Sequence, residues 1–226
     1  FFGTEQVEWP NGNRIHVADA FYREHYRNAG DGGSCDGFSA TSLLNYKNLS
    51  QPNAGNFAMS HYSPLYSQNK NNDMAEAYAF SQAIQMGLEV NAHRQWMCEL
   101  VGNSPRALYQ YLKSQIQNNT PVVLGIRWNR EYSQWPWPSL QPGSHALVPY
   151  RFEEPSSDEA YVYVYDSNLP GNDKHRVEFD LTNDTWSYRW PVPLRPDITI
   201  QGDSSYCSLS VTPIEMYRRQ GVAWWA

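Results

Sequence analysis

The sequence has little of several features that mark specialised classes of protein. Its three cysteines include no Cys-x-x-Cys pair, the spacing typical of a metal site. No run of lysine and arginine occurs and the formal net charge is −6, so the positive surface that binds nucleic acid is missing. No apolar segment approaches the length of a membrane span, and no internal repeat is visible. These absences predict a protein with no metal or other cofactor, no nucleic-acid partner and no transmembrane helix.

What the sequence does contain is the composition of a globular protein with many aromatic side chains. Of its 226 residues, 41% are hydrophobic and 15% are aromatic, and a chain of this length can bury a sizeable core. Because no linker-like segment divides it, we expect a single domain over residues 1–226. The abundance of Asn, Tyr and Trp favours an extracellular or cell-surface protein, and a disulfide between Cys98 and Cys207 would point the same way. No feature of the sequence predicts an oligomeric state.

Helix signals precede strand signals along the chain. Apolar spacing and capping residues predict helices at 38–49, 73–86 and 104–119. In the third of these, Ser104 is expected to cap the N-terminus with Pro105 in the first turn. Short apolar or alternating runs predict strands at 121–128, 145–152, 160–168, 175–181, 185–190 and 206–213. This segregation predicts an α+β fold, with a helical part at about 28–118 and an antiparallel sheet at about 121–213.

One cysteine lies between a glycine-rich segment and a predicted helix, in the stretch NAGDGGSCDGFSATSLLNY (28–46). Cys35 falls near the first turn of that helix, where unpaired N–H groups and the helix dipole favour a negative charge. A thiolate is such a charge, and it is the reactive form of cysteine. The same local sequence also fits an inert, buried thiol, which is the state of most free cysteines. Cys35 is therefore a candidate nucleophile whose role depends on its partners.

A nucleophilic cysteine needs a general base, and the sequence offers six histidines. His145 has the best setting, because it opens a predicted strand after the turn sequence QPGS, where a rigid side chain can face a cleft. The alternative for His145 is a structural histidine bonded to a backbone carbonyl. Of the rest, His93 is expected in an irregular polar stretch. A structural or surface role is expected for the five that lack a partner motif: His16, His25, His61, His93 and His175.

A base needs an acceptor that orients it, and Asp166 ends the strand that follows the His145 strand. The two strands are joined by a short loop and should pair as a hairpin, so the start of one faces the end of the other. Asp166 could then accept a hydrogen bond from the imidazole and fix its tautomer. Asn168 is the second candidate for this orienting role. The alternative is an ordinary turn aspartate, because the segment after the strand is rich in turn residues.

Three segments resemble the signature blocks of papain-like cysteine peptidases, and most closely those of the bacterial branch grouped with peptidase family C39. They are GGSCDGFSATSLL, GSHALVPYRF and YVYVYDSNLPG, in the same chain order as in that family. The resemblance implies a two-lobe fold, with a helical lobe, an antiparallel sheet lobe and an active-site cleft between them. It also implies a peptide or protein substrate, with Cys35 as nucleophile, His145 as proton shuttle and Asp166 as its orienting group, through a thioester intermediate.

The sequence departs from this family in one place. Its members carry a glutamine a few residues before the cysteine, and the glutamine amide helps to form the oxyanion hole. Here no glutamine lies between Gln6 and Cys35, and Asn28 is the nearest candidate amide. The departure keeps open the possibility of a catalytically inactive homologue.

Two other functions compete with peptide hydrolysis. A transglutaminase-like acyl transferase would use the same three residue types, although the wide spacing of Cys35 and His145 in the chain favours the peptidase. A non-catalytic module could bind glycans or peptides through aromatic side chains that the sequence places in polar surroundings. The aromatic residues considered for that role are Trp128, Tyr132, Trp135 and Trp137.

Overall fold

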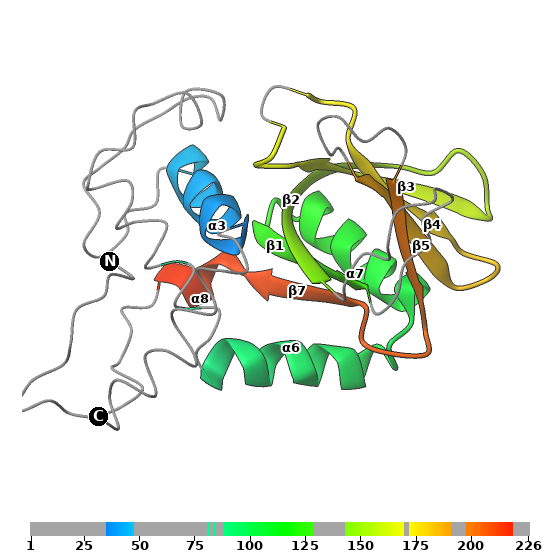
Figure 1. Cartoon of the computed structure of the whole chain (residues 1–226), viewed down its shortest axis with the longest axis horizontal. Coiled ribbons are helices and arrows are strands. Elements are labelled where there is room, and N and C mark those ends of the chain that lie inside the picture. Colours follow the sequence, from blue (N-terminus) through cyan, green and yellow to red (C-terminus); the bar gives the residue numbers. More distant parts are fainter. Residues whose placement is uncertain are drawn as a thin grey trace, which may run out of the picture.

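The computed structural model describes residues 35–47, 81, 84, 88–128, 143–169, 172–190 and 198–218. Within them, the helices are α3 (Cys35–Tyr46), α6 (Leu88–Leu100), α7 (Pro105–Gln117) and α8 (Ile214–Arg218). The strands are β1 (Val122–Trp128), β2 (Gly143–Glu153), β3 (Glu159–Tyr165), β4 (Arg176–Asp180), β5 (Thr185–Trp190), β6 (Ile198–Asp203) and β7 (Leu209–Pro213). Three of these helices precede a run of antiparallel strands (Figure 1), which confirms the predicted α+β class.

The described strands form one antiparallel sheet in the order β6-β5-β4-β3-β2-β1-β7. β6 and β7 are consecutive in the chain but lie at opposite edges, and the segment from Asp203 to Leu209 can span only about 21 Å. A flat sheet of this width would separate its outer strands by about 29 Å, at about 4.8 Å per gap. The sheet is therefore curled. β6 contacts β1, and the Arg127 N–H donates to the Ser208 carbonyl over 2.8 Å.

The curl encloses the main hydrophobic core. α7 lies inside it and contacts β2, β4, β5 and β7, and its Leu108 and Leu112 belong to the same buried cluster as side chains from all of the described strands. A second cluster lies on the other face of β1 and β2, where α3 and α8 cover residues such as Val123 and Ala146. Because both faces of these two strands are covered, their sequences read as continuous apolar runs. The second cluster also places the start of α3 next to β2.

The N-terminus of α7 confirms the cap expected from the sequence. The Ser104 hydroxyl accepts a hydrogen bond from the Ala107 N–H over 3.1 Å, and Pro105 occupies the first turn. The same hydroxyl donates to the Asp184 carboxylate over 2.8 Å. The cap therefore also ties α7 to the turn between β4 and β5.

The prediction that His93 lies in an irregular stretch is wrong. His93 lies in the helix α6. Its inward face contains Val90, Met97 and Cys98, which are buried at helical spacing. Arg94 lies on the same side between them, and this charged residue hides the helical period in the sequence.

Two further elements were not predicted, and one predicted element is not described. β6 and the short helix α8 were not among the expected elements. The helix expected at 73–86 lies outside the described residues except for Ser81 and Ile84. None of the helices in the described ranges is long and apolar enough to cross a membrane.

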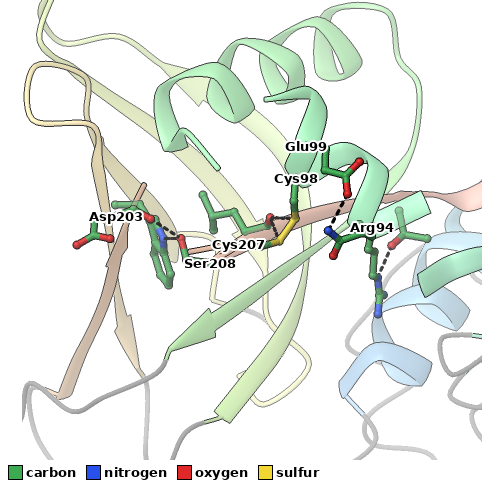
Figure 2. The surroundings of a disulfide bond; sticks show 10 residues. Arg94, Cys98, Glu99, Asp203, Cys207 and Ser208 are labelled. Atoms are coloured by element: carbon green, nitrogen blue, oxygen red, sulfur yellow. Dashed lines mark hydrogen bonds between the residues drawn. A yellow bond between two sulfur atoms is a disulfide. The ribbon is translucent and has the colours of Figure 1, made fainter. Parts of the chain in front are cut away.

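A disulfide joins Cys98, in the last turn of α6, to Cys207, which precedes β7 (Figure 2). Their Cα atoms are 5.6 Å apart, although the residues are 109 positions apart in the sequence. The pairing that the sequence left open is thus present in the structure. Cys35 is the free cysteine of the three.

Replacing Cys98 and Cys207 together with serine is expected to lower the free energy of unfolding by about 2–4 kcal/mol. The cross-link closes a long loop, so its loss releases chain entropy in the unfolded state. Urea unfolding followed by circular dichroism would measure the change. Cys35→Ser is the matched control, since it removes a thiol and keeps the cross-link. A change in the double variant no larger than in this control would contradict the prediction.

Candidate active site

Cys35 is the first residue of α3 in the structure, so the helix begins three residues before the predicted range of 38–49, and the Cys35 side chain is partly buried. α3 is held against β2 by apolar packing of Leu43 and Leu44. It is also held by a hydrogen bond in which the Ser39 hydroxyl donates to the Ala146 carbonyl over 2.9 Å. Ala146 is the neighbour of His145, so this bond fixes the first turns of α3 relative to the histidine.

His145 is the third residue of β2, a strand flanked by β1 on one side and β3 on the other. It pairs with Ile126 in the β1 ladder, and its side chain is only 3% exposed. Its Nε2 atom lies 2.9 Å from Oδ1 of Asp166, and the Cys35 side chain is in hydrogen-bonding contact with the same imidazole. The structure therefore brings together the three residues that the sequence singled out, with His145 in the middle.

Asp166 directly follows the last residue of β3 and is fully buried. The β2–β3 ladder pairs Val148 with Tyr165, so one more step along it brings Asp166 opposite Leu147. Side chains of residues two apart share a face of a strand. This is why Asp166 and His145 point to the same side of the sheet. The hairpin argument made from the sequence therefore has a direct geometric basis.

The Asp166 carboxylate accepts three hydrogen bonds. Oδ1 accepts from His145 and from the Asn168 backbone N–H, which lies 2.8 Å away. Oδ2 accepts from the Tyr188 hydroxyl on β5 over 2.5 Å. Asn168 thus meets this site through its backbone, while its side chain is exposed. Of these two residues, Asp166 is the one whose side chain bonds to the imidazole.

Tyr188 is a member of the site that the sequence did not reveal. It lies at an inward-facing position of β5 and is buried. Burial raises the pKa of its hydroxyl far above the usual value, and the Asp166 charge raises it further, so Tyr188 is a neutral hydrogen-bond donor. The alternation in the sequence of β5 shows that Tyr188 points inward, but it contains no signal for an acidic partner more than 20 residues away.

The protonation states follow from these contacts. Burial lowers the pKa of His145, but the hydrogen bonds and charges of Asp166 and Cys35 outweigh it and raise the pKa to about 9. Burial raises the pKa of Asp166, but the hydrogen bonds from His145, Tyr188 and the Asn168 backbone lower it below its usual value. At neutral pH the site therefore contains an imidazolium held between a carboxylate and a cysteine side chain.

The remaining candidates lie elsewhere or outside the described residues. Asn28, the expected amide donor, lies outside them. His93 lies on α6, where its ring packs near Trp96. His175 precedes β4, with its ring near Tyr188 and within the electrostatic influence of Asp166. The histidines outside the described residues are His16, His25 and His61.

Trp128 was one of the aromatic residues considered for a binding surface, and the structure shows that this expectation is wrong. Its side chain is buried in the core and its ring lies against the backbone of Gly143, where a Cβ atom would come within 2.4 Å of it. It is therefore not a surface aromatic. The other three aromatic residues considered for binding lie outside the described residues.

The described residues contain no group of three His, Cys, Asp or Glu side chains arranged to hold a metal ion. The side chains that the structure joins at this site are a thiol, an imidazolium and a carboxylate. This arrangement can form a nucleophile, transfer a proton and hold the proton donor in one orientation.

The model of the Peptidase_C39 like family matches residues 17–191 of the chain. The match spans most of the chain and contains the three sequence blocks that carry Cys35, His145 and Asp166. It confirms the relationship expected from those blocks. No curated protein and no solved structure gives a significant match to the chain.

Proposed function

Because the chain belongs to the peptidase C39-like family, we propose that it is a cysteine peptidase, or a related amide hydrolase, with Cys35, His145 and Asp166 as its catalytic triad. The observation that carries the proposal is the buried His145 imidazole, which contacts Cys35 and bonds to Asp166 through Nε2. That bond leaves Nδ1 as the second nitrogen of the ring, available for exchanging a proton with the thiol.

In the proposed first step, the Cys35 thiolate attacks the carbonyl carbon of the scissile amide. The His145 imidazolium donates its proton to the leaving nitrogen, the carbon–nitrogen bond breaks, and the amine departs. The acyl group is left on Cys35 as a thioester. The Cys35 backbone N–H at the start of α3 is the proposed donor to the oxyanion, and Asn28 is the side chain proposed to assist it.

In the second step, the neutral His145 removes a proton from water, which attacks the thioester carbonyl. The acid product leaves, and the thiolate and imidazolium are restored. Asp166 holds the ring in one orientation and stabilises its positive charge in both steps. We place these steps in a papain-like two-lobe arrangement, with the start of α3 on one side of the substrate and the curled sheet on the other.

The disulfide between Cys98 and Cys207 supports a location outside the cytosol, because such bonds persist in oxidising surroundings. We therefore propose an extracellular or cell-surface protein that acts on a peptide or protein substrate.

Incubation with a peptide library of mixed sequence, read by mass spectrometry, is expected to yield new peptide termini with the wild-type protein and none with Cys35→Ala. Cleavage should weaken as the pH rises through about 9, because His145 then loses the proton that it gives to the leaving nitrogen. The proposal fails if Cys35→Ala cleaves as well as the wild type.

The same experiment separates the competing functions. Adding a primary amine tests the acyl transferase, which would attach the amine to the acyl group in place of water. A Cys35 thiol that reacts no faster with iodoacetamide than a thiol of the denatured chain, with no cleavage of any peptide, would favour an inactive homologue acting as a binding module.

A further inference from the structure

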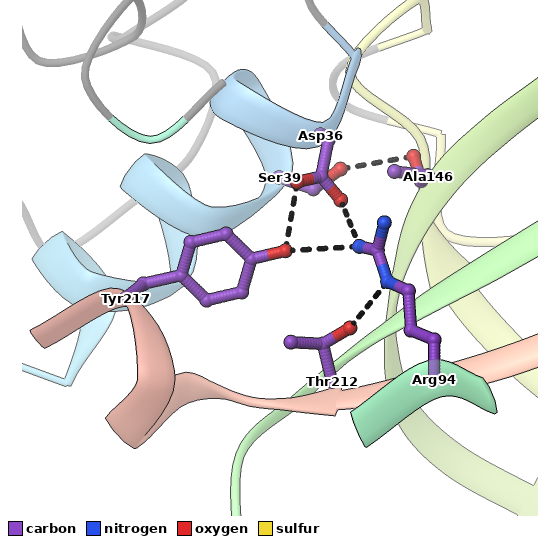
Figure 3. A network of polar contacts seen from close by, with 6 residues as sticks. All are labelled: Asp36, Ser39, Arg94, Ala146, Thr212 and Tyr217. Carbon is purple, nitrogen blue, oxygen red and sulfur yellow. Dashed lines mark hydrogen bonds and ion pairs between the residues drawn. The ribbon is translucent and has the colours of Figure 1, made fainter. Parts of the chain in front are cut away.

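A buried cluster of charged and polar side chains surrounds Asp36, the residue that follows Cys35 in the chain (Figure 3). The Asp36 carboxylate, only 2% exposed, accepts hydrogen bonds from Arg94 Nη2 over 3.0 Å and from the Tyr217 hydroxyl over 2.7 Å. Arg94 also contacts the Tyr217 hydroxyl through Nη2 and donates from Nε to the Thr212 hydroxyl over 2.9 Å. The cluster therefore joins α3, α6, β7 and α8 at the start of α3.

The charges in this cluster depend on one another. Burial lowers the pKa of Arg94, but the charge of Asp36 raises it above the ordinary value, so the guanidinium stays charged. Burial raises the pKa of Tyr217 well above its usual value, and the Asp36 charge adds to this effect. Tyr217 is thus a neutral donor, and Arg94 is the positive charge that compensates Asp36. Without Arg94, the carboxylate would be a buried and unbalanced charge, which is costly.

The position of Asp36 links this cluster to the thiol. Asp36 follows Cys35 in the chain, in the first turn of α3. A carboxylate on the residue next to a thiol opposes the thiolate by like-charge repulsion unless a cation balances it. One turn further along α3, the Ser39 hydroxyl bonds to the neighbour of His145. The cluster and the Ser39 bond together fix where Cys35 meets His145.

We propose that Asp36, Arg94 and Tyr217 are positioning residues for Cys35, which fix the first turn of α3 and neutralise the carboxylate next to the thiol. This inference rests on the proposed function, because it assigns the cluster a role in the reactivity of the nucleophile. Two members of the cluster, Thr212 and Tyr217, lie beyond the 17–191 range of the family match. The last part of the chain therefore completes the environment of a residue near its beginning.

Within the described residues, the titratable groups that face Cys35 and Asp36 from packed elements are few. They are His145 from β2, Arg94 from α6 and Tyr217 from α8. Since His145 acts on the thiol from the sheet side, its contribution must be separated from that of the cluster. The experiment therefore compares variants of the cluster with His145→Ala.

The test is the rate of Cys35 alkylation by iodoacetamide as a function of pH, followed by intact mass. Cys35 is the free thiol of the native chain because the other two cysteines are bonded, so labelling without reductant reports on it alone. Arg94→Met is expected to move the midpoint of the rate–pH profile upward by about one pH unit or more, as loss of a nearby opposite charge does. Tyr217→Phe removes one hydroxyl from a buried ring and is expected to move it in the same direction by less.

Two further variants separate positioning from general stability. Tyr109→Phe is the matched control, because Tyr109 is also fully buried and also bonds to a carboxylate, that of Glu154, but away from Cys35. It should leave the midpoint unchanged. The double variant Asp36→Asn with Arg94→Met removes both charges and should return the midpoint toward the wild-type value.

An unchanged midpoint in folded Arg94→Met and Tyr217→Phe would overturn the proposal and leave the cluster a purely structural one. If Arg94→Met does not fold, Tyr217→Phe decides, since its ring keeps the packing of the core. Failure of the proposed function looks different. In that case the wild-type thiol itself reacts as slowly as an ordinary thiol, and His145→Ala changes nothing.

Discussion

His145→Ala is expected to slow the alkylation of Cys35 at pH 6 by about 100-fold. An ordinary thiol, with a pKa of about 8.5, is ionised to only about 0.3% at this pH. A buried imidazolium in contact with the thiol stabilises the thiolate, and the structure keeps that imidazolium protonated through its bond to Asp166. Intact-mass kinetics with iodoacetamide would measure the change without knowledge of the natural substrate.

His175→Ala is the matched control for this experiment. His175 lies close to Tyr188 and is influenced by the charge of Asp166, so it shares the neighbourhood of the site. We expect its replacement to change the alkylation rate by less than about threefold, since it takes no part in the contacts of His145 with Asp166 and Cys35. Equal rates for the wild type and His145→Ala would show that Cys35 is not paired with the imidazole.

The sheet was largely predictable because most of its strands carry a local signal. Apolar runs indicated β1 and β2, whose two faces are both covered, and alternation indicated β4 and β5. β6 was not predicted. In the structure it pairs with β5 and forms one edge of the sheet. The curl could not be read from any single segment. It follows from the short link between β6 and β7, and that link has a meaning only once the strand order is known.

For the site too, the features that depend on neighbouring residues could be predicted from the sequence, and those that depend on residues far apart in the chain could not. The position of Cys35 near the first turn of α3 and the approach of His145 to Asp166 follow from a helix signal and a hairpin, which are local features of the chain. Arg94 could not be predicted as a partner, because what makes its burial possible is Asp36, which lies 58 positions away. Its charge instead interrupts the apolar face of α6, so the residue that concealed the helix in the sequence is the same one that bonds α6 to Asp36, next to Cys35.

The orienting residue can be identified by comparing Asp166→Ala with Asn168→Ala. We expect Asp166→Ala to lower kcat/KM for a cleaved peptide by about 10²–10⁴-fold, the range of a general acid–base contribution, because His145 then loses its acceptor and its proton. Asn168→Ala should change kcat/KM by less than about threefold. Its side chain is exposed, and its contact with Asp166 is made by the backbone N–H, which alanine retains.

Asp166→Ala also leaves the buried Tyr188 hydroxyl without its acceptor, so part of its effect could come from the loss of a buried hydrogen bond rather than from the histidine. Tyr188→Phe isolates that part, because it removes the same hydrogen bond and keeps the carboxylate beside His145. If Tyr188→Phe lowers kcat/KM far less than Asp166→Ala does, the larger effect belongs to the His145–Asp166 contact. A greater loss in Asn168→Ala than in Asp166→Ala would instead assign the orienting role to Asn168, because only its side chain differs between that variant and the wild type.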